Sequence, residues 1–460
     1  MKRIFSHAEW YKAVDDCALR LWLLGARRGM RIGITGILTP LQVISFFALM
    51  RLGAIACPFP SWAWLMHVKL ASKIQLDGLI EEEGENTDKI FPSPPLRIDA
   101  KPLRNCSSEI RKETCEEKLE AKYEREPHPT QNGNLPRFIT WGEEMDRIVT
   151  MIPTSGSSGE RKVVLHTLRQ HFANAKGANL NAPLAPGDLW LASIPLHHIG
   201  GVALLFRVWT AQARWSVGSP FDWEECRSIG VTHLSMTSIQ LDDWINMGEK
   251  SRSSSTPLKA IVVSGGNFSA STLDRAYALG LPLVLSYTLT EMSSQVTATP
   301  LKADRAQWNT CGYALQGREW TLREEEILVR GETLAEGYLG ETPFREQFEG
   351  GWFPTGDLGK GSDRGLIILG RKVDQCLWEG REVHASTLSS FLRSVLQDEK
   401  RRIIVVPYGQ ERSPIAMVEG LRNRELLGGI VSLPWPEHLL HGGKLKWERS
   451  DVLEYIASFS

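Results

Sequence analysis

Residues 151–162 read Met-Ile-Pro-Thr-Ser-Gly-Ser-Ser-Gly-Glu-Arg-Lys, and they lie between a β-rich run and the apolar residues 163–165. The small residues allow backbone N–H groups to face an anion, and four hydroxyls and Lys162 can contact phosphate oxygens. A Walker-type loop needs glycine, lysine and a hydroxyl residue in succession, whereas two residues separate Gly159 from Lys162. The stretch therefore predicts a phosphate-binding loop of another type, with a Ser/Gly-rich linker as the alternative. The predicted phosphate contacts are Thr154, Ser155, Gly156, Ser157, Ser158, Gly159 and Lys162.

Helical and β-rich segments alternate on both sides of this loop. Residues 8–60 read as helix, strand, helix and strand, and short β-rich runs recur as far as residue 285. Such alternation favours an α/β fold with parallel strands covered by helices. Antiparallel-looking strands follow, and a small tail begins after Gly370. We expect a large domain over residues 1–370 and a small one over residues 371–460.

The composition is that of an ordinary globular protein. The chain has 460 residues, of which 42% are hydrophobic and 23% charged, and its formal net charge is −1. A charge this small gives no general attraction for nucleic acid or an anionic membrane. The seven cysteines are odd in number and form no Cys-x-x-Cys pair, which argues against a disulfide framework and against a structural zinc site. The pattern favours a protein of a reducing compartment.

No targeting or membrane-spanning segment is evident in the sequence. The most membrane-like run, residues 34–50, contains Pro40, Gln42 and Ser45, whereas about 20 apolar residues are needed to cross a bilayer. We therefore expect a cytoplasmic protein. Residues 81–141 break the alternation of helix and strand with proline-rich and charged stretches, and we expect there a loop or weakly helical insertion without chemistry.

The phosphate loop resembles the Thr-Ser-Gly-Thr-Thr-Gly-x-Pro-Lys signature of the adenylate-forming enzymes, which are acyl-CoA synthetases, adenylation domains and luciferases. Further motifs of that family follow in its order. They are Ser264-Gly265-Gly266-Asn267, Tyr287-Thr288-Leu289-Thr290-Glu291, Leu328-Val329-Arg330-Gly331 with Gly337-Tyr338, the residues 351–359, and Gly370-Arg371-Lys372. The resemblance implies a large N-terminal domain of stacked mixed sheets with helices and a small, mobile α+β C-terminal domain.

The resemblance also implies ATP, Mg²⁺ and the co-substrate CoA. A carboxylate attacks the α-phosphorus of ATP, so donors and cations must screen two anions. Glu291 offers a hard oxygen ligand to Mg²⁺, and Thr290 can donate to the α-phosphate. The family places Gly265 and Gly266 beside the adenine, Asp357 on the ribose hydroxyls, and Arg371 on ribose or phosphate, and it assigns Tyr287 to the same nucleotide site.

The family ends in a Gly-Lys-Ile-x-Arg-x-x-Leu-like block whose lysine reaches the reacting carboxylate. Lys444 follows glycine directly, but only Lys446 has an apolar residue at +1, Arg449 at +3 and an apolar residue at +6. We therefore assign the catalytic lysine to Lys446, with two solvated charges as the alternative.

Several positions depart from the family pattern. Arg161 replaces a proline and Thr288 a glycine, Val373 stands at the hinge position, and residues 378–382 replace a glycine-rich turn. The change at Val373 concerns the hinge about which the family's small domain rotates, and the change at residues 378–382 concerns the loop that would line the channel for the CoA thiol.

The acid pocket resembles that of o-succinylbenzoate–CoA ligases of menaquinone synthesis. Residues 194–201 match their Pro-x-x-His-Ile-Ser-Gly pattern, with Gly200 in place of serine. His198 would line the pocket near the reacting carboxylate as a neutral donor. Arg207 would meet a second carboxylate of a diacid, or else pair with a local acid in the protein.

We therefore expect an AMP-forming acid–CoA ligase that makes an acyl-adenylate and then an acyl-CoA, with o-succinylbenzoate as substrate. The alternatives are a ligase or adenylating enzyme for another aryl or short acid, and a degenerate nucleotide-binding regulator. The expected partners are small molecules, with no nucleic acid and no membrane span, and a homo-oligomer is possible.

Overall fold

The computed structural model describes residues 3–36, 38–59, 73–81, 96–99, 139–154, 162–221, 223–248, 258–265, 269–397, 403–418, 420–434 and 456. The chain divides into two compact units. The first comprises residues 1–154, 162–319 and 330–352, and the second comprises residues 155–161, 320–329 and 353–460. A division into compact units does not test which residues move together, so the boundary at residue 370 stays a prediction.

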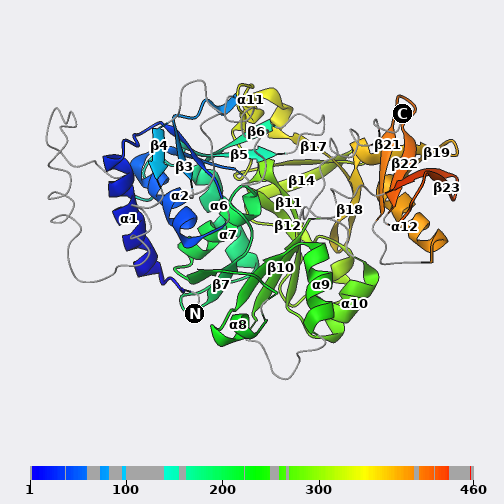
Figure 1. The fold of residues 1–460 in the computed structure, drawn as a ribbon, viewed down its shortest axis with the longest axis horizontal. Coiled ribbons are helices and arrows are strands. Elements are labelled where there is room, and N and C mark those ends of the chain that lie inside the picture. Colours follow the sequence, from blue (N-terminus) through cyan, green and yellow to red (C-terminus); the bar gives the residue numbers. More distant parts are fainter. Residues whose placement is uncertain are drawn as a thin grey trace. The chain divides into compact units, whose positions relative to one another are not determined.

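The first unit contains a seven-stranded sheet that carries the ends of the phosphate loop (Figure 1). Its order is β16 (Gly337–Tyr338), β6 (Lys162–Thr167), β5 (Ile148–Thr154), β2 (Ile55–Pro58), β1 (Arg31–Ile34), β3 (Gly78–Glu81) and β4 (Leu96–Asp99). The strands from β5 to β4 are parallel, whereas β6 and β16 are antiparallel to their neighbours. The predicted mixed sheet is confirmed.

A second seven-stranded sheet carries the other family motifs of this unit. Its order is β13 (Tyr313–Ala314), β12 (Ser294–Ala298), β11 (Leu283–Leu289), β10 (Ala260–Ser264), β9 (His233–Met236), β7 (Leu189–Ala192) and β8 (Arg214–Val217). The strands from β8 to β11 are parallel, and β12 and β13 turn back antiparallel.

Helices cover and separate the two sheets of the first unit (Figure 1). They are α1 (His7–Leu23), α2 (Pro40–Leu52), α6 (Leu168–Asn181), α7 (Ile199–Thr210), α8 (Trp223–Ser228), α9 (Ser238–Gly248), α10 (Ala270–Ala278) and α11 (Phe344–Gln347). α6 packs against β6 of one sheet and β12 of the other, and α7 packs beside it. The main hydrophobic core therefore lies between the sheets, around these two helices.

Local sequence signals define the helix ends. Ser6 and Glu9 form a reciprocal capping box at the start of α1, and Thr39 caps α2 with Pro40 in its first turn. Gly53 ends α2 in the left-handed conformation. Residues 41–52 are all buried, so the apolar run that most resembled a membrane segment is a core helix. Among the described residues, no helix is long and apolar enough to cross a membrane.

The second unit contains a helix and strands that pair antiparallel except for β22 and β24, which pair parallel. A four-stranded sheet has the order β14 (Arg318–Arg323), β15 (Glu326–Gly331), β17 (Phe353–Ser362) and β18 (Gly365–Arg371). A hairpin of β19 (Gln375–Trp378) and β20 (Arg381–His384) precedes α12 (Ala385–Val395). α12 packs on a sheet with the order β21 (Ile403–Tyr408), β22 (Ser413–Val418), β24 (Ile430–Pro434) and β23 (Glu425–Leu427). The predicted α+β character of the tail is confirmed.

The expectation of a loop or weak helix over residues 81–141 is wrong at one place. Leu96–Asp99 form the edge strand β4, which pairs parallel with β3. Four residues are enough for an edge strand because its partner supplies the backbone hydrogen bonds, and the flanking prolines concealed this short signal. The sequence also predicts a final helix near residues 449–457, which lies outside the described residues except for Ile456.

Candidate active site

A β-hairpin holds both ends of the predicted phosphate loop. β5 and β6 pair antiparallel, and Thr154 lies opposite Lys162 as the last pair before the loop. The predicted contacts between them, residues 155–159, lie outside the described residues. The described ends therefore fix where the loop leaves the sheet and where its lysine returns.

The ammonium group of Lys162 lies over an aromatic ring. Its Nζ is 4.1 Å from the ring centroid of Tyr338 and 3.8 Å from Oε1 of Glu341. The Lys162 side chain is 37% exposed and that of Glu341 is 44% exposed, so their ion pair contributes about 0–1 kcal/mol. An incoming phosphate can therefore displace Glu341 at little cost.

Glu291 contacts the same tyrosine. The hydroxyl of Tyr338 donates a 2.8 Å hydrogen bond to Oε1 of Glu291. Thr290 and Glu291 lie in the short 3₁₀ turn η1 (Thr290–Met292), directly after β11, in which Tyr287 is buried. The structure thus brings the predicted phosphate lysine and the predicted magnesium carboxylate to one side chain.

The backbone that follows η1 is strained. Ser293 and Ser294 have φ values of 54° and 117°, in the region that favours glycine. Three hydrogen bonds hold this turn: Ser293 N to Thr290 O, Ser293 Oγ to Thr333 O, and Ala335 N to Glu291 O. Strain of this kind persists only where the surroundings enforce it, so the turn that carries Glu291 has a fixed conformation.

Thr288, which replaces the family's glycine, lies at a bulge between β11 and β12. It is not among the residues with positive φ. The conformational freedom of glycine is therefore not required at this position, and the departure from the family motif is compatible with the local backbone.

A buried pair of histidines supports the same turn. Nε2 of His166 lies 2.7 Å from the carbonyl oxygen of Thr290, and because a carbonyl only accepts, this nitrogen carries the proton. The Thr150 hydroxyl lies 3.4 Å from Nδ1 of His166 and 2.8 Å from Nε2 of His171. Burial lowers the pKa of His166 to about 4 and that of His171 well below its usual value, so both rings are neutral.

These contacts define a directed chain of hydrogen bonds. If Thr150 donates to His166 Nδ1, it can accept from His171 Nε2–H, which leaves only the lone pair of His171 Nδ1 without a partner. The opposite direction would leave a buried N–H at His171 unpaired, which is rarer in proteins. The sequence did not assign His166, His171 or Tyr338 a role, although Tyr338 belongs to one of the family motifs.

The predicted adenine turn begins at the carboxyl end of β10. Gly265 has a φ of 78°, and its carbonyl accepts a hydrogen bond from Ser238 Oγ. Gly266 lies outside the described residues. β10 and β11 are parallel neighbours, so Gly265 and the Tyr287–Glu291 motif follow adjacent strands at the same edge of the sheet.

His198 and Arg207 occupy the two ends of α7. His198 is the N-cap residue and is exposed, with its ring 4.3 Å from that of His197. Gly201 lies in the first turn, where a Cβ would collide with the carbonyl oxygens of Ile194 and Pro195. Nine residues of helix correspond to about 14 Å, so His198 and Arg207 belong to different environments.

Arg207 is 3% exposed and its hydrogen bonds go to protein oxygens. Nε donates to Asn179 Oδ1 at 2.9 Å, and Nη2 donates to the carbonyl of Ala182 at 2.8 Å, at the end of α6. The guanidinium also lies 4.5 Å from the Trp190 ring. Burial, with a smaller contribution from Arg318, lowers the pKa of Arg207 to about 9. The described contacts therefore make Arg207 a buried cap of α6.

In the second unit, the two predicted ribose contacts are neighbours. Asp357 in β17 lies opposite Arg371 in β18, and Arg371 Nε is 3.3 Å from Asp357 Oδ1. Asp357 is 6% exposed. Thr355 Oγ accepts from the Asp357 N–H, and Glu326 Oε1 accepts from the Gly356 N–H. These bonds fix the turn that presents the carboxylate.

The altered segment after Arg371 forms a tight hairpin. Glu379 and Gly380 have φ values of 50° and 75°, which is the two-residue type I′ turn that joins β19 to β20. His384 at the end of β20 accepts a 2.9 Å hydrogen bond from the Arg371 N–H. Gly370 has a φ of 141°, and a Cβ there would collide with the His384 ring. The predicted lysine, Lys446, and its alternative Lys444 lie outside the described residues.

The described residues fit a magnesium ion shared with phosphates. No group of three or more His, Cys, Asp or Glu in the described part of the chain could hold a metal ion alone. Mg²⁺ is usually held by one or two carboxylates together with substrate phosphates and water. Glu291, which contacts the same tyrosine as Lys162, could supply such a carboxylate.

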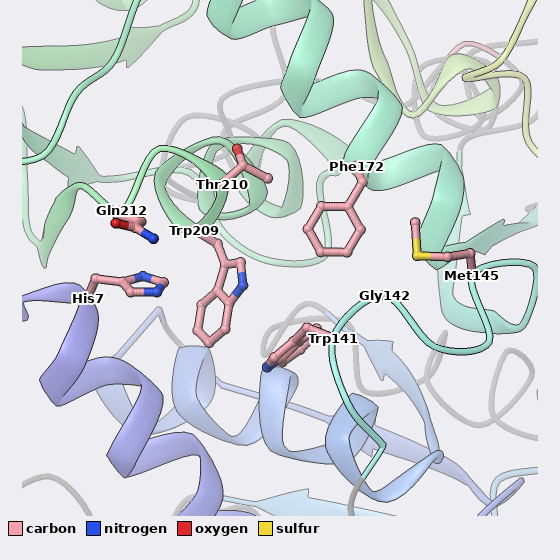
Figure 2. Close-up of a pocket in the computed structure, with 8 residues that line it drawn as sticks. All are labelled: His7, Trp141, Gly142, Met145, Phe172, Trp209, Thr210 and Gln212. Atoms are coloured by element: carbon pink, nitrogen blue, oxygen red, sulfur yellow. The ribbon is translucent and has the colours of Figure 1, made fainter.

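A separate pocket of about 420 Å³ lies in the first unit, and Figure 2 shows the residues that line it. It lies at the end of α7 opposite His198, where Trp209 and Thr210 face Trp141 and Phe172, with His7 of α1 at one side. Its lining includes none of the predicted site residues.

Comparison with known proteins yields a consistent result. Residues 2–339 match the model of the family described as AMP-binding enzyme. The chain is 29% identical over 343 residues to the 2-succinylbenzoate–CoA ligase of Salmonella typhimurium, which covers 71% of this chain and 72% of that one. It is 26% identical over 460 residues to the ligase of that name from Escherichia coli, covering 96% and 91%.

The fold matches that of a solved structure, the o-succinylbenzoate–CoA synthetase of Bacillus subtilis in complex with ATP and magnesium ion. The TM-score is 0.73 with 21% identity, and the match covers 91% of this chain and 85% of that one. The predicted fold class is confirmed.

Proposed function

Because the chain belongs to the AMP-binding enzyme family, we propose that it is an AMP-forming acid–CoA ligase that converts o-succinylbenzoate to o-succinylbenzoyl-CoA. The names of its Salmonella and Escherichia coli relatives support this substrate. The structural observation that carries the proposal is the placement of Lys162 and Glu291 around Tyr338. Such a ligase would act in the cytoplasm, in menaquinone biosynthesis.

In the first half-reaction, a carboxylate oxygen of the acid forms a bond to the α-phosphorus of ATP, and the bond to the β-phosphate oxygen breaks. Lys162, together with the loop residues that start at Thr154, would hold the departing pyrophosphate. Glu291 would hold Mg²⁺, which would supply positive charge against the phosphates. Thr290 would donate to the α-phosphate, in a turn whose carbonyl is held by His166.

The remaining nucleotide contacts come from three other places. Gly265 and Gly266 would border the adenine beside Tyr287. Asp357 would accept from the ribose hydroxyls, since an ionised carboxylate is an acceptor only, and Arg371 beside it would contact ribose or phosphate. Lys446 would reach the reacting carboxylate.

The acid would lie near the N-terminus of α7. His198 is the exposed N-cap residue of this helix and its side chain makes no capping hydrogen bond. The positive end of the helix dipole favours a carboxylate there. Arg207, buried at the other end of α7, would support the acid pocket indirectly, by fixing α7 against α6.

In the second half-reaction, the CoA sulfur forms a bond to the acyl carbon and AMP leaves. This step would need rotation of residues 371–460, with Val373 at the hinge. The type I′ turn at residues 379–380 would occupy the position of the family's glycine-rich turn.

The test is pyrophosphate release from ATP with a panel of acids, followed by thioester formation with CoA. We expect turnover with o-succinylbenzoate, and a loss of at least tenfold in Lys162→Met. Lys176→Met, which changes an exposed lysine on α6 away from the site, should retain activity. Adenylation of a different acid would overturn the substrate, and ATP binding without pyrophosphate from any acid would overturn the ligase.

A further inference from the structure

We propose that Tyr338 is a positioning residue that keeps the ammonium of Lys162 and the carboxylate of Glu291 apart and correctly placed for one nucleotide–magnesium complex. This inference rests on the proposed function, because it assigns these two groups to phosphate and metal. The face of the tyrosine ring holds the cation at 4.1 Å, and its hydroxyl holds the carboxylate oxygen at 2.8 Å.

The backbone around Tyr338 is tied to both groups. β16 pairs with β6, with Tyr338 opposite Val164, two residues after Lys162. The N–H groups of Glu336 and Leu339 donate to the carbonyls of Leu165 and Val163. The N–H of Ala335 donates to the carbonyl of Glu291 at 2.8 Å. One short segment, residues 335–339, therefore sets the distance between the hairpin and the turn η1.

The ring itself is also fixed. Its centroid is 4.8 Å from that of Phe344 at an interplanar angle of 84°, which is a favourable edge-to-face contact. Phe344 is fully buried at the start of α11. A ring held from behind in this way presents a constant face to the ammonium and a constant direction to its hydroxyl.

Electrostatics explains why the site needs such a spacer. A lysine and a glutamate that face one binding site attract each other, and a direct ion pair would withdraw both from the ligand. The tyrosine instead gives the cation an aromatic face and gives the carboxylate a neutral donor. Neither interaction neutralises a charge that the nucleotide or the magnesium ion requires.

Two substitutions separate the functions of the ring and the hydroxyl. Tyr338→Phe keeps the ring and its packing but removes the donor to Glu291. Tyr338→Leu removes both the donor and the aromatic face. Tyr277→Phe is the matched control, because Tyr277 is a half-exposed residue of the same unit whose ring makes a comparable edge contact with Trp308.

The readout is calorimetric binding of ATP by the full-length chain over a range of Mg²⁺ concentrations, alongside pyrophosphate release. In Tyr338→Phe we expect the Mg²⁺ concentration for half-maximal binding to rise about tenfold, with unchanged affinity for ATP in the absence of Mg²⁺. In Tyr338→Leu we expect the metal-free affinity to fall as well, about threefold or more, because the lysine loses its support. Tyr277→Phe should match the wild type in both measurements.

The proposal is overturned if Tyr338→Phe requires no more Mg²⁺ than the wild type, or if Tyr338→Leu and Tyr338→Phe behave alike. If the leucine variant does not fold, the phenylalanine variant decides alone, since it preserves the packing. A wild type that binds no nucleotide overturns this proposal together with the proposed function. A wild type with normal turnover and unaffected variants overturns the positioning role only.

Discussion

Replacement of Thr150 by valine should reduce the free energy of unfolding by about 1–3 kcal/mol. Valine has the shape of threonine and suits a strand, so the backbone of β5 is expected to persist. The change removes only the hydroxyl that lies between two buried histidine rings, 2.8 Å from His171 Nε2 and 3.4 Å from His166 Nδ1.

The magnitude follows from what the hydroxyl leaves behind. His171 is 1% exposed, so its Nε2–H would have no water to replace the lost acceptor. A buried donor without a partner costs about 1–3 kcal/mol. The 3.4 Å contact to His166 is long for a hydrogen bond and adds little to this estimate.

Urea unfolding followed by circular dichroism measures the difference. Thr297→Val is the control, because Thr297 is a fully buried strand residue of the same unit whose hydroxyl has no hydrogen-bond partner among the described residues. That variant should be unchanged or slightly stabilised. Equal losses in the two variants would show that Thr150 does not link the histidines, and the directed chain to the Thr290 carbonyl would be refuted.

Three further outcomes are expected. Because the pKa of His166 is about 4 in the fold and about 6.5 when unfolded, the unfolded chain binds more protons between these values, and stability falls as pH falls through that window. His166→Gln should remove about 2 kcal/mol of the stability loss measured between pH 7 and pH 5, and an unchanged pH profile would contradict this. Gly370→Ala should lower the melting temperature more than Gly380→Ala, since both require positive φ but only Gly370 also contacts the His384 ring; equal losses would argue against that contact. Lys446→Ala should reduce adenylation about a hundredfold while thioester formation from preformed acyl-adenylate continues, and the same pattern in Lys444→Ala would move the catalytic assignment by two residues.

Much of the fold could be predicted because its signals are local. Pro40 after Thr39, Gly53 at a helix end, and β-rich runs of four or more residues define elements without reference to distant parts of the chain. β4 was missed because its four residues become a strand only through pairing with β3. Residues 379–380 form a type I′ turn where the family has a glycine-rich turn. Gly380, which such a turn favours, is the one sequence signal for it.

The site was predictable as a set of motifs but not as a network. Lys162, Glu291 and Tyr338 belong to separate motifs. The Lys162–Tyr338 contact joins residues 176 positions apart in the sequence, and the Tyr338–Glu291 hydrogen bond joins residues 47 positions apart. Arg207 illustrates the opposite case. The sequence predicted that Arg207 contacts a substrate carboxylate or a local acid. In the structure its side chain is buried and donates a hydrogen bond to the carbonyl of Ala182.

The pairing of Thr154 with Lys162 limits how this hairpin can change in length. An insertion between the two residues leaves both strands in register, so the ammonium keeps its place above Tyr338. An insertion of a single residue within β6 reverses the side of the sheet to which every later side chain points, and removes His166 from Thr290. Natural variation in length should therefore be confined to the loop tip. The flanking strands accept only changes that keep each side chain on the same face of the sheet.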